Sequence, residues 1–135
     1  MKHLLVFFSI PALFMSCAYG YEAVSDIAYI KSYRYNAHQN PVDIYYDNER
    51  PEKPFIQFAI IEIKGAEYDN INYLLTLMRQ QAQGIGADGV MNVRKDFAGR
   101  QKGFLLDAFT DDEPENYTAP VFTGIAIKYI TDDSQ

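Results

Sequence analysis

Residues 55–93 read FIQFAIIEIKGAEYDNINYLLTLMRQQAQGIGADGVMNV, and this stretch decides the fold. It begins with a largely apolar run over Phe55 to Lys64, which is typical of a central strand ended by Gly65. A second apolar run over Ala87 to Val93 predicts another buried strand. Between the two runs, apolar side chains recur at helical spacing: Ile71, Leu74, Leu75, Met78, Ala82 and Ile85. A strand, a helix and a strand in succession favour a right-handed crossover with the two strands parallel.

The ends of the expected helix carry sequence signals of their own. Asp69 is the predicted N-cap, because its carboxylate can accept the free amide hydrogens of the first turn. Tyr68 and Tyr73 then stand at the spacing of a hydrophobic staple. Gly84 is the predicted left-handed residue that closes the helix, and Gly86 adds a second point of conformational freedom.

The flanking sequence supplies the remaining elements of one small domain. The expected strands cover 42–46, 103–109 and 121–130, and the expected loops cover 47–54, 94–102 and 110–116. The fold class is therefore α+β: a small mixed sheet in the order β-β-α-β-β with one amphipathic helix packed on one face. A single helix covers only one face, so the lead-in segment, a second copy or a partner would cover the other.

The N-terminus reads as an export signal. Residues 1–16 have a basic start and an apolar run of about 12 residues, too short for the 20 or so that span a bilayer. Phe14-Met15-Ser16-Cys17 resembles a bacterial lipobox, which makes Cys17 the expected lipidation site and the mature N-terminus. Ala18-Tyr19-Gly20 offers a competing cleavage site after Gly20, which would leave a soluble exported protein.

Cysteine usage and charge exclude several classes of function. Cys17 is the single cysteine, so the mature domain has no internal disulfide. The chain carries 18 Asp and Glu against 12 Lys and Arg, and this acidic balance argues against nucleic acid, whose phosphates need a basic surface. We expect four segments: signal peptide 1–16, tether or lead-in 17–40, globular domain 41–130 and polar tail 131–135. Within the lead-in, the alternation of Ile27, Tyr29, Tyr33 and Tyr35 suits a strand packed on the domain.

Three groups of side chains are candidate sites, each with a competing structural interpretation. An acidic turn could coordinate calcium, although its spacing matches no calcium loop; it contains Asp107, Asp111, Asp112, Glu113 and Glu115. A basic hairpin tip could touch lipid phosphate or an acidic partner; it contains Arg94, Lys95, Arg100 and Lys102. A tyrosine set could form a recognition patch or pack along the sheet; it contains Tyr29, Tyr33, Tyr35, Tyr45 and Tyr46. For each group the solvated or packed interpretation is preferred.

Two short motifs and the search for chemistry complete the survey. Asn116-Tyr117-Thr118 is a glycosylation sequon only in a glycosylating host, and Gly84 to Gly89 reads as a helix-to-strand turn rather than a phosphate loop. His38 is the sole histidine beyond the signal, so we predict no catalytic residue, no metal site and no cofactor. A hydrolase that uses two converging carboxylates is the least favoured alternative.

The order of these motifs resembles a known family. The motifs are Pro41-Val42-Asp43-Ile44-Tyr45-Tyr46, Lys53-Pro54-Phe55, Ile61 to Gly65, the amphipathic helix, Gly86 to Met91, and Gly124-Ile125-Ala126-Ile127-Lys128-Tyr129. Over 41–130 they resemble the RcsF family of outer-membrane stress-sensor lipoproteins and, more loosely, the small YbjQ-type "heavy-metal-binding" domains. The disulfide-forming cysteines of the enteric sensor have no counterpart after Cys17.

The resemblance implies location and a binding role more than an activity. It implies an outer-membrane lipoprotein, palmitate-modified at Cys17, whose domain faces the periplasm and binds an unidentified envelope protein as a non-enzymatic sensing or assembly module. The alternative is a soluble exported homo-oligomer of YbjQ type.

Overall fold

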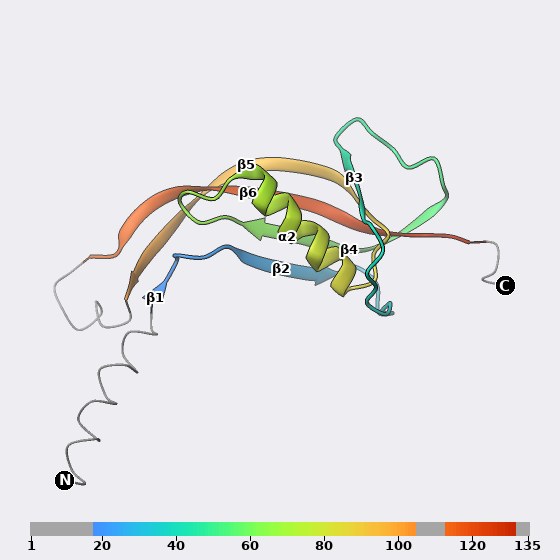
Figure 1. Cartoon of the computed structure of the whole chain (residues 1–135), viewed down its shortest axis with the longest axis horizontal. Helices are drawn as coiled ribbons and strands as arrows, with labels where there is room; N and C mark the ends of the chain where they lie inside the picture. The colour runs from blue at the N-terminus through green and yellow to red at the C-terminus, as the bar shows by residue number, and fades with distance from the viewer. Residues whose placement is uncertain (1–17, 105–112, 132–135) are drawn as a thin grey trace, which may run out of the picture.

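The computed structural model describes residues 18–104 and 113–131, which form an α+β fold (Figure 1). Within these residues it contains one helix and a six-stranded sheet. The elements in chain order are β1 (Ala18–Tyr19), β2 (Val24–Tyr29), β3 (Asp43–Tyr46), β4 (Phe55–Lys64), α2 (Ile71–Gly84), β5 (Gly89–Phe104) and β6 (Glu115–Tyr129). In the described part of the chain, no helix is long and apolar enough to span a bilayer.

The sheet has the strand order β1-β5-β6-β4-β2, with β3 paired to the N-terminal half of β5. The β3–β5 pairing is parallel and the other pairings are antiparallel. Because β4 and β5 are both antiparallel to β6, they run in the same direction with β6 between them. The mixed sheet is thus built around β6, which pairs with β5 on one side and with β4 on the other.

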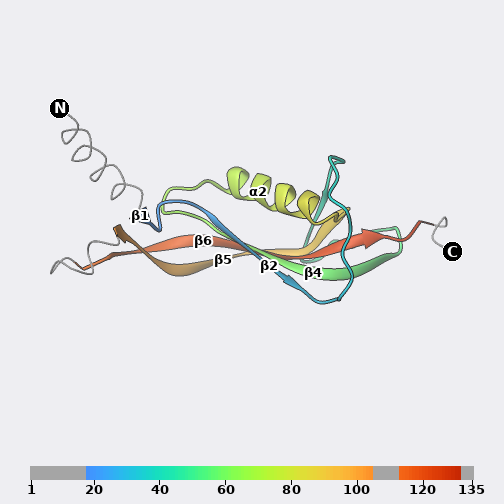
Figure 2. The same ribbon diagram turned by 90° about the horizontal axis from the view of Figure 1, so that it is seen from below.

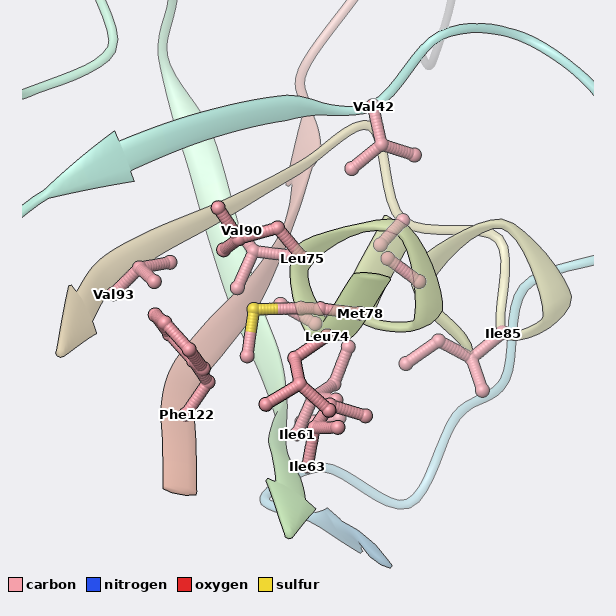
Figure 3. Packing of buried hydrophobic residues seen from close by; sticks show 14 of the residues in the cluster. Val42, Ile61, Ile63, Leu74, Leu75, Met78, Ile85, Val90, Val93 and Phe122 are labelled. Atoms are coloured by element: carbon pink, nitrogen blue, oxygen red, sulfur yellow. The ribbon is translucent and has the colours of Figure 1, made fainter. Parts of the chain in front are cut away.

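The helix α2 covers one face of this sheet, as Figure 2 shows most clearly. Its buried side chains are Leu74, Leu75, Met78 and Ala82, all on the stripe expected from the sequence. They pack against apolar side chains of β4 and β6, among them Ile61, Ile63 and Phe122 (Figure 3). Full burial of one such side chain contributes about 1.5–3 kcal/mol, so this layer is the core of the domain.

The N-terminus of α2 differs from the sequence prediction. The N-cap is Asn70, whose Oδ1 accepts a hydrogen bond from the backbone N–H of Tyr73 at 2.8 Å. Asp69 instead accepts from the backbone N–H of Ala66 at 2.7 Å, which closes the turn before the helix. Tyr68 is 89% exposed, so the predicted staple is wrong as well.

The C-terminus of α2 also ends differently. Gly84 is the last helical residue, and the left-handed residue is Gly86, with φ +78°. The N–H of Gly86 donates to the carbonyl of Gln83 and the N–H of Ala87 to that of Ala82, the paired bonds of a Schellman motif. A Cβ at Gly86 would lie 2.5 Å from the carbonyl oxygen of Asn36, so the position also needs the smallest side chain.

The longest difference from the sequence prediction lies in β5. We expected a loop over 94–102 and a separate strand over 103–109, but β5 runs unbroken from Gly89 to Phe104. Its partner β6 begins at Glu115 rather than 121. Beyond Val93 most β5 side chains are exposed or half-buried, so the sequence lacks the alternation of apolar and polar residues that predicts a strand. Residues 105–109 lie outside the described part of the chain.

A bulge in β5 shapes the centre of the sheet. The register with β6 shifts between Met91 and Arg94, and Asn92 has a positive φ of 52°. Gly124 lies opposite, where a Cβ would stand 2.4 Å from Cγ1 of Val90. The bulge therefore packs the side chains of β5 onto a strand position that has none.

The lead-in before Pro41 forms part of the sheet. β2 pairs with β4 along its whole length, and Tyr35 stacks edge-on against Phe58 at 4.8 Å. β1 and β2 lie at opposite edges of the sheet although only residues 20–23 separate them. These four residues, the crossing segment, lie against β5 and β6: Gly20 is fitted against Gln101 and Lys102, and its carbonyl accepts a hydrogen bond from Tyr117.

Candidate functional site

The first candidate site is the end of the sheet where the described chain begins. In the register of β1 and β5, Ala18 faces Phe104 and Tyr19 faces Gly103. Cys17 itself lies outside the described residues, but it is bonded to Ala18. The expected anchor residue is therefore the immediate neighbour of a strand of the domain, with no linker between them.

Gly20 fits closely against β5 and β6. Its φ is +78°, and a Cβ there would lie 2.0 Å from the carbonyl oxygen of Gln101. Its own carbonyl accepts a hydrogen bond from the Tyr117 hydroxyl at 2.6 Å. Since Tyr117 is buried, loss of this acceptor would leave a polar group without its partner.

Arg100 joins the crossing segment to the end of β4. Its Nη1 donates to the carbonyl oxygens of Glu22 at 3.1 Å, Lys64 at 3.3 Å and Gly65. Hydrogen bonds from a guanidinium are stronger than those between neutral groups. One side chain of β5 thus holds two segments that lie 42 residues apart in the chain, Glu22 and Lys64.

Lys102 is the second cation at this end of the sheet. It forms ion pairs with Glu67 and, at 3.3 Å, with Glu115, and its side chain is only 14% exposed. The hydrogen bond to Glu67 raises the pKa of this ammonium group above its usual value, although burial acts in the opposite direction. Lys102 is therefore a structural cation, already neutralised by acids of the same domain.

The four basic residues expected at a hairpin tip consequently form no common cationic surface. Arg94 is exposed and lies 3.9 Å from Asp47, near β3, whereas Lys95 lies over the ring of Phe97 at 4.8 Å. Arg100 and Lys102 are both engaged with backbone carbonyls or acids, as described above. All four belong to strand β5, so the expectation of a solvated loop is wrong.

Aromatic side chains remain exposed beside β1. Tyr19, Tyr21 and Phe104 are 38%, 50% and 46% exposed. The rings of Tyr21 and Phe104 lie 5.9 Å apart, at a tilt of 42°. We call these three residues the aromatic end of the sheet.

The second candidate site lies on the sheet face opposite α2. A pocket of about 420 Å³ opens there over the β5 bulge. It is lined by Asp47, Ile60, Asn92, Arg94, Thr123, Gly124 and Ile125. Ile60 is an apolar side chain on this face and is 38% exposed. The lead-in does not cover it, because β2 pairs with the edge of β4 and does not pack on the face.

A hydrogen-bonded tyrosine pair lies at the far end of the sheet. The hydroxyl of Tyr129 donates to Asp43 at 2.7 Å, and the hydroxyls of Tyr45 and Tyr129 are also 2.7 Å apart. Burial, followed by these hydrogen bonds, raises the pKa of the Tyr129 phenol well above its usual value. Asp43 and Glu52 line the same pocket, of about 330 Å³, but the Asp43 carboxylate is already the acceptor that joins β3 to β6.

The expected tyrosine patch is dispersed over the molecule. Tyr29 lies on edge strand β2 beneath the guanidinium of Arg34, at 3.4 Å, whereas Tyr45 and Tyr46 belong to β3 at the other edge. Tyr33 and Tyr35 are in edge contact at 5.4 Å, next to the core. These rings lie at separate places, and those of Tyr29, Tyr33 and Tyr46 are exposed.

The remaining candidate residues form no common site within the described part of the chain. Asp107, Asp111 and Asp112 lie outside the described residues, Glu115 pairs with Lys102, and the part of the chain that is described holds no cluster of three metal-ligating side chains. The sequon 116–118 lies within β6, and Gly84 to Gly89 is the expected helix-to-strand turn. His38 lies 3.6 Å from Asp88, which in turn pairs with Lys128 at 2.8 Å.

Sequence reasoning named Gly20, Arg100 and Tyr117 only as parts of a cleavage site, a basic tip and a sequon, and it did not predict the contacts that they make in the structure. The only local signal was Gly20 itself, a glycine just before the lead-in alternation. The contacts join segments about 80 residues apart, and no periodic pattern announces them.

Comparison of the chain with protein-family models, curated proteins and solved structures gives no match.

Proposed function

We propose that the protein is a lipid-anchored module of the bacterial cell envelope, lipidated at Cys17 and non-enzymatic, which binds another envelope protein. The observation that carries the proposal is that Ala18 and Tyr19 pair with β5, and that the carbonyl of Gly20 accepts a hydrogen bond from Tyr117. The expected location is the outer membrane, with the domain facing the periplasm.

This observation bears on the choice between two cleavage sites. Cleavage after Gly20 would remove β1 from β5 and take away the acceptor of the Tyr117 hydroxyl. Cleavage before Cys17 leaves both contacts in the mature protein. The structure of the segment therefore supports the lipobox over the ordinary signal-peptidase site.

The binding role rests on the sheet face opposite α2. We infer that the core from residue 41 onward has the RcsF-like order β-β-α-β-β, with its one amphipathic helix on a single face. The pocket around Ile60 and Ile125 then offers the other face to a partner. Its lining combines two apolar side chains with Arg94, Asp47 and Asn92, a mixture typical of protein interfaces.

Labelling with alkyne palmitate tests the anchor. The wild-type protein should incorporate the label, Cys17→Ala should lose it, and the matched control Ser16→Ala should keep it because a small residue still precedes the cysteine. Mass spectrometry of the mature protein should show Cys17 as the first residue. A mature N-terminus at Tyr21, without label, would refute lipid anchorage and favour the soluble alternative.

Site-directed photocrosslinking tests the binding face. A photoreactive residue at Ile60 or Ile125 should give a crosslink to a different envelope protein, and the same residue at Tyr73, on the exposed side of α2, should not. Crosslinks between two copies would instead support the homo-oligomeric alternative. Equal products from all three positions would contradict a specific binding face.

A further inference from the structure

We propose that the aromatic end of the sheet, formed by Tyr19, Tyr21 and Phe104, inserts into the headgroup region of the membrane that holds the lipid anchor. The proposal rests on the lipidation of Cys17 proposed above. It adds that the domain lies directly on the bilayer, in one orientation, rather than at the end of a tether.

Chain length restricts the distance between the anchor and these rings. Tyr21 is four residues beyond Cys17, and four extended residues reach at most about 14 Å. Phe104 faces Ala18 across one strand spacing, about 4.8 Å. The headgroup region is about 5–8 Å thick on each side of the hydrocarbon core, so this short reach allows all three rings to lie at its depth when Cys17 is lipidated.

The start of the domain is also held rigidly. β1 is paired with β5, Gly20 is fitted against Gln101, and Arg100 binds the carbonyl of Glu22. The segment that follows the anchor therefore cannot swing away from the sheet without breaking these contacts. Figure 1 shows β1 at one end of the long sheet and the C-terminal end of β6 at the other, so the sheet would extend away from the bilayer.

The exposed groups at this end suit the lipid interface. Aromatic rings are favoured at the level of the headgroups, where the apolar body of tyrosine and its hydroxyl find matching surroundings. Attraction to anionic lipid would need free cations, but Lys102 is paired with Glu67 and Glu115. The fitting partner is accordingly the headgroup region of zwitterionic phospholipid.

Tryptophan fluorescence tests this placement, because the chain contains no tryptophan and a single introduced one reports its own surroundings. The full mature lipoprotein is reconstituted in phosphatidylcholine vesicles as Tyr21→Trp, Phe104→Trp or, as matched control, Tyr46→Trp. Tyr46 is 46% exposed at the end of β3, which Figure 1 places far from β1. Palmitate labelling and circular dichroism of each variant establish that it is lipidated and folded.

The expected result is a blue-shifted emission maximum for the Tyr21→Trp and Phe104→Trp variants, with loss of emission when brominated phosphatidylcholine replaces the ordinary lipid. The control at position 46 should show neither effect. If the lipidated variants keep water-exposed emission at positions 21 and 104, the membrane contact is refuted while the anchor stands. If Cys17 carries no label, the anchor proposal fails first, and the membrane contact fails with it.

Discussion

Gly124 shows how one missing side chain can decide a local structure. It lies opposite the β5 bulge, where Asn92 has a positive φ and where Val90 and Val93 fill the space above the strand. An asparagine tolerates this left-handed conformation better than a β-branched residue does. The absence of a Cβ at Gly124 thus allows the bulge to pack on the core.

We expect Gly124→Ala to destabilise the protein by about 1–3 kcal/mol, because the new Cβ would overpack the core against Val90. The matched control is Gly99→Ala, also in a strand, where no atom lies within 4 Å of the added Cβ. Urea unfolding of both variants measures the difference in the free energy of unfolding. Equal stabilities would contradict the close packing at Gly124.

The raised pKa of Tyr129 leads us to expect a smaller free energy of unfolding at alkaline pH. Burial and its hydrogen bonds raise the pKa of this phenol above the ordinary value of 10.0, so the unfolded chain releases the proton first. Its contribution is complete below pH 10 and declines as the pH rises further, because the folded state then binds more protons than the unfolded one.

The urea midpoint of the wild type should therefore fall more steeply above pH 10 than that of Tyr129→Phe. Tyr68→Phe serves as the control, since Tyr68 is 89% exposed. Lys102, whose pKa is also raised, contributes in the same direction in all three proteins. Parallel pH profiles for the wild type and Tyr129→Phe would rule out this role for Tyr129.

At the scale of the element, α2 shows which features of a helix its own sequence can predict. Its buried stripe follows from the spacing of Leu74, Leu75, Met78 and Ala82 alone. Its ends do not, because Asp69 and Asn70 are both good caps, and Gly84 and Gly86 both good terminators. The chain around Tyr35 and Asn36, packed against Gly86, helps to select one terminator of the two.

Gly86→Ala should cost about 1–2 kcal/mol from the left-handed backbone alone. Its Cβ would in addition meet the carbonyl of Asn36 at 2.5 Å. Gly84→Ala, by contrast, should stabilise the helix by roughly 0.5–1 kcal/mol, because alanine is the better helix former. Thermal or urea unfolding of the two variants checks the opposite signs, and a reversed order would show that Gly84 is the true terminator.

At the scale of the whole molecule, residues that are far apart in the chain hold the sheet together. β1 and β2 come from the first residues of the described chain, yet they occupy opposite edges of the sheet. Gly20 and Arg100 hold the crossing between them. Within the segment expected to be a tether or a lead-in, β1 and β2 therefore contribute strands to the sheet.

A protein that starts at Tyr21 should be less stable than one that starts at Ala18, by roughly 0.5–1.5 kcal/mol for each hydrogen bond lost. Tyr117→Phe provides the internal control: it should destabilise the longer chain, where the hydroxyl binds Gly20, and have little effect on the shorter one. Urea unfolding of the four proteins gives the coupling energy directly. A coupling near zero would show that residues 18–20 contribute nothing to the fold.

The sequence by itself determined the features that depend on local periodicity. The apolar runs of β4 and early β5 and the helical stripe of α2 repeat at fixed spacings, and each spacing reports one buried face. The position of Cys17 after an apolar segment predicts the anchor in the same local way.

Only the tertiary structure decided the extent of β5, the residues that cap α2 and the contacts that hold the crossing segment next to the aromatic end. Beyond Val93 the strand is held by backbone hydrogen bonds to β6. Backbone pairing places no requirement on the type of side chains that face water, so the sequence shows no strand pattern there. Gly20, Arg100 and Tyr117 meet because the sheet brings distant segments together. Contacts of this kind depend on where the strands lie in space, so no local pattern in the chain can specify them.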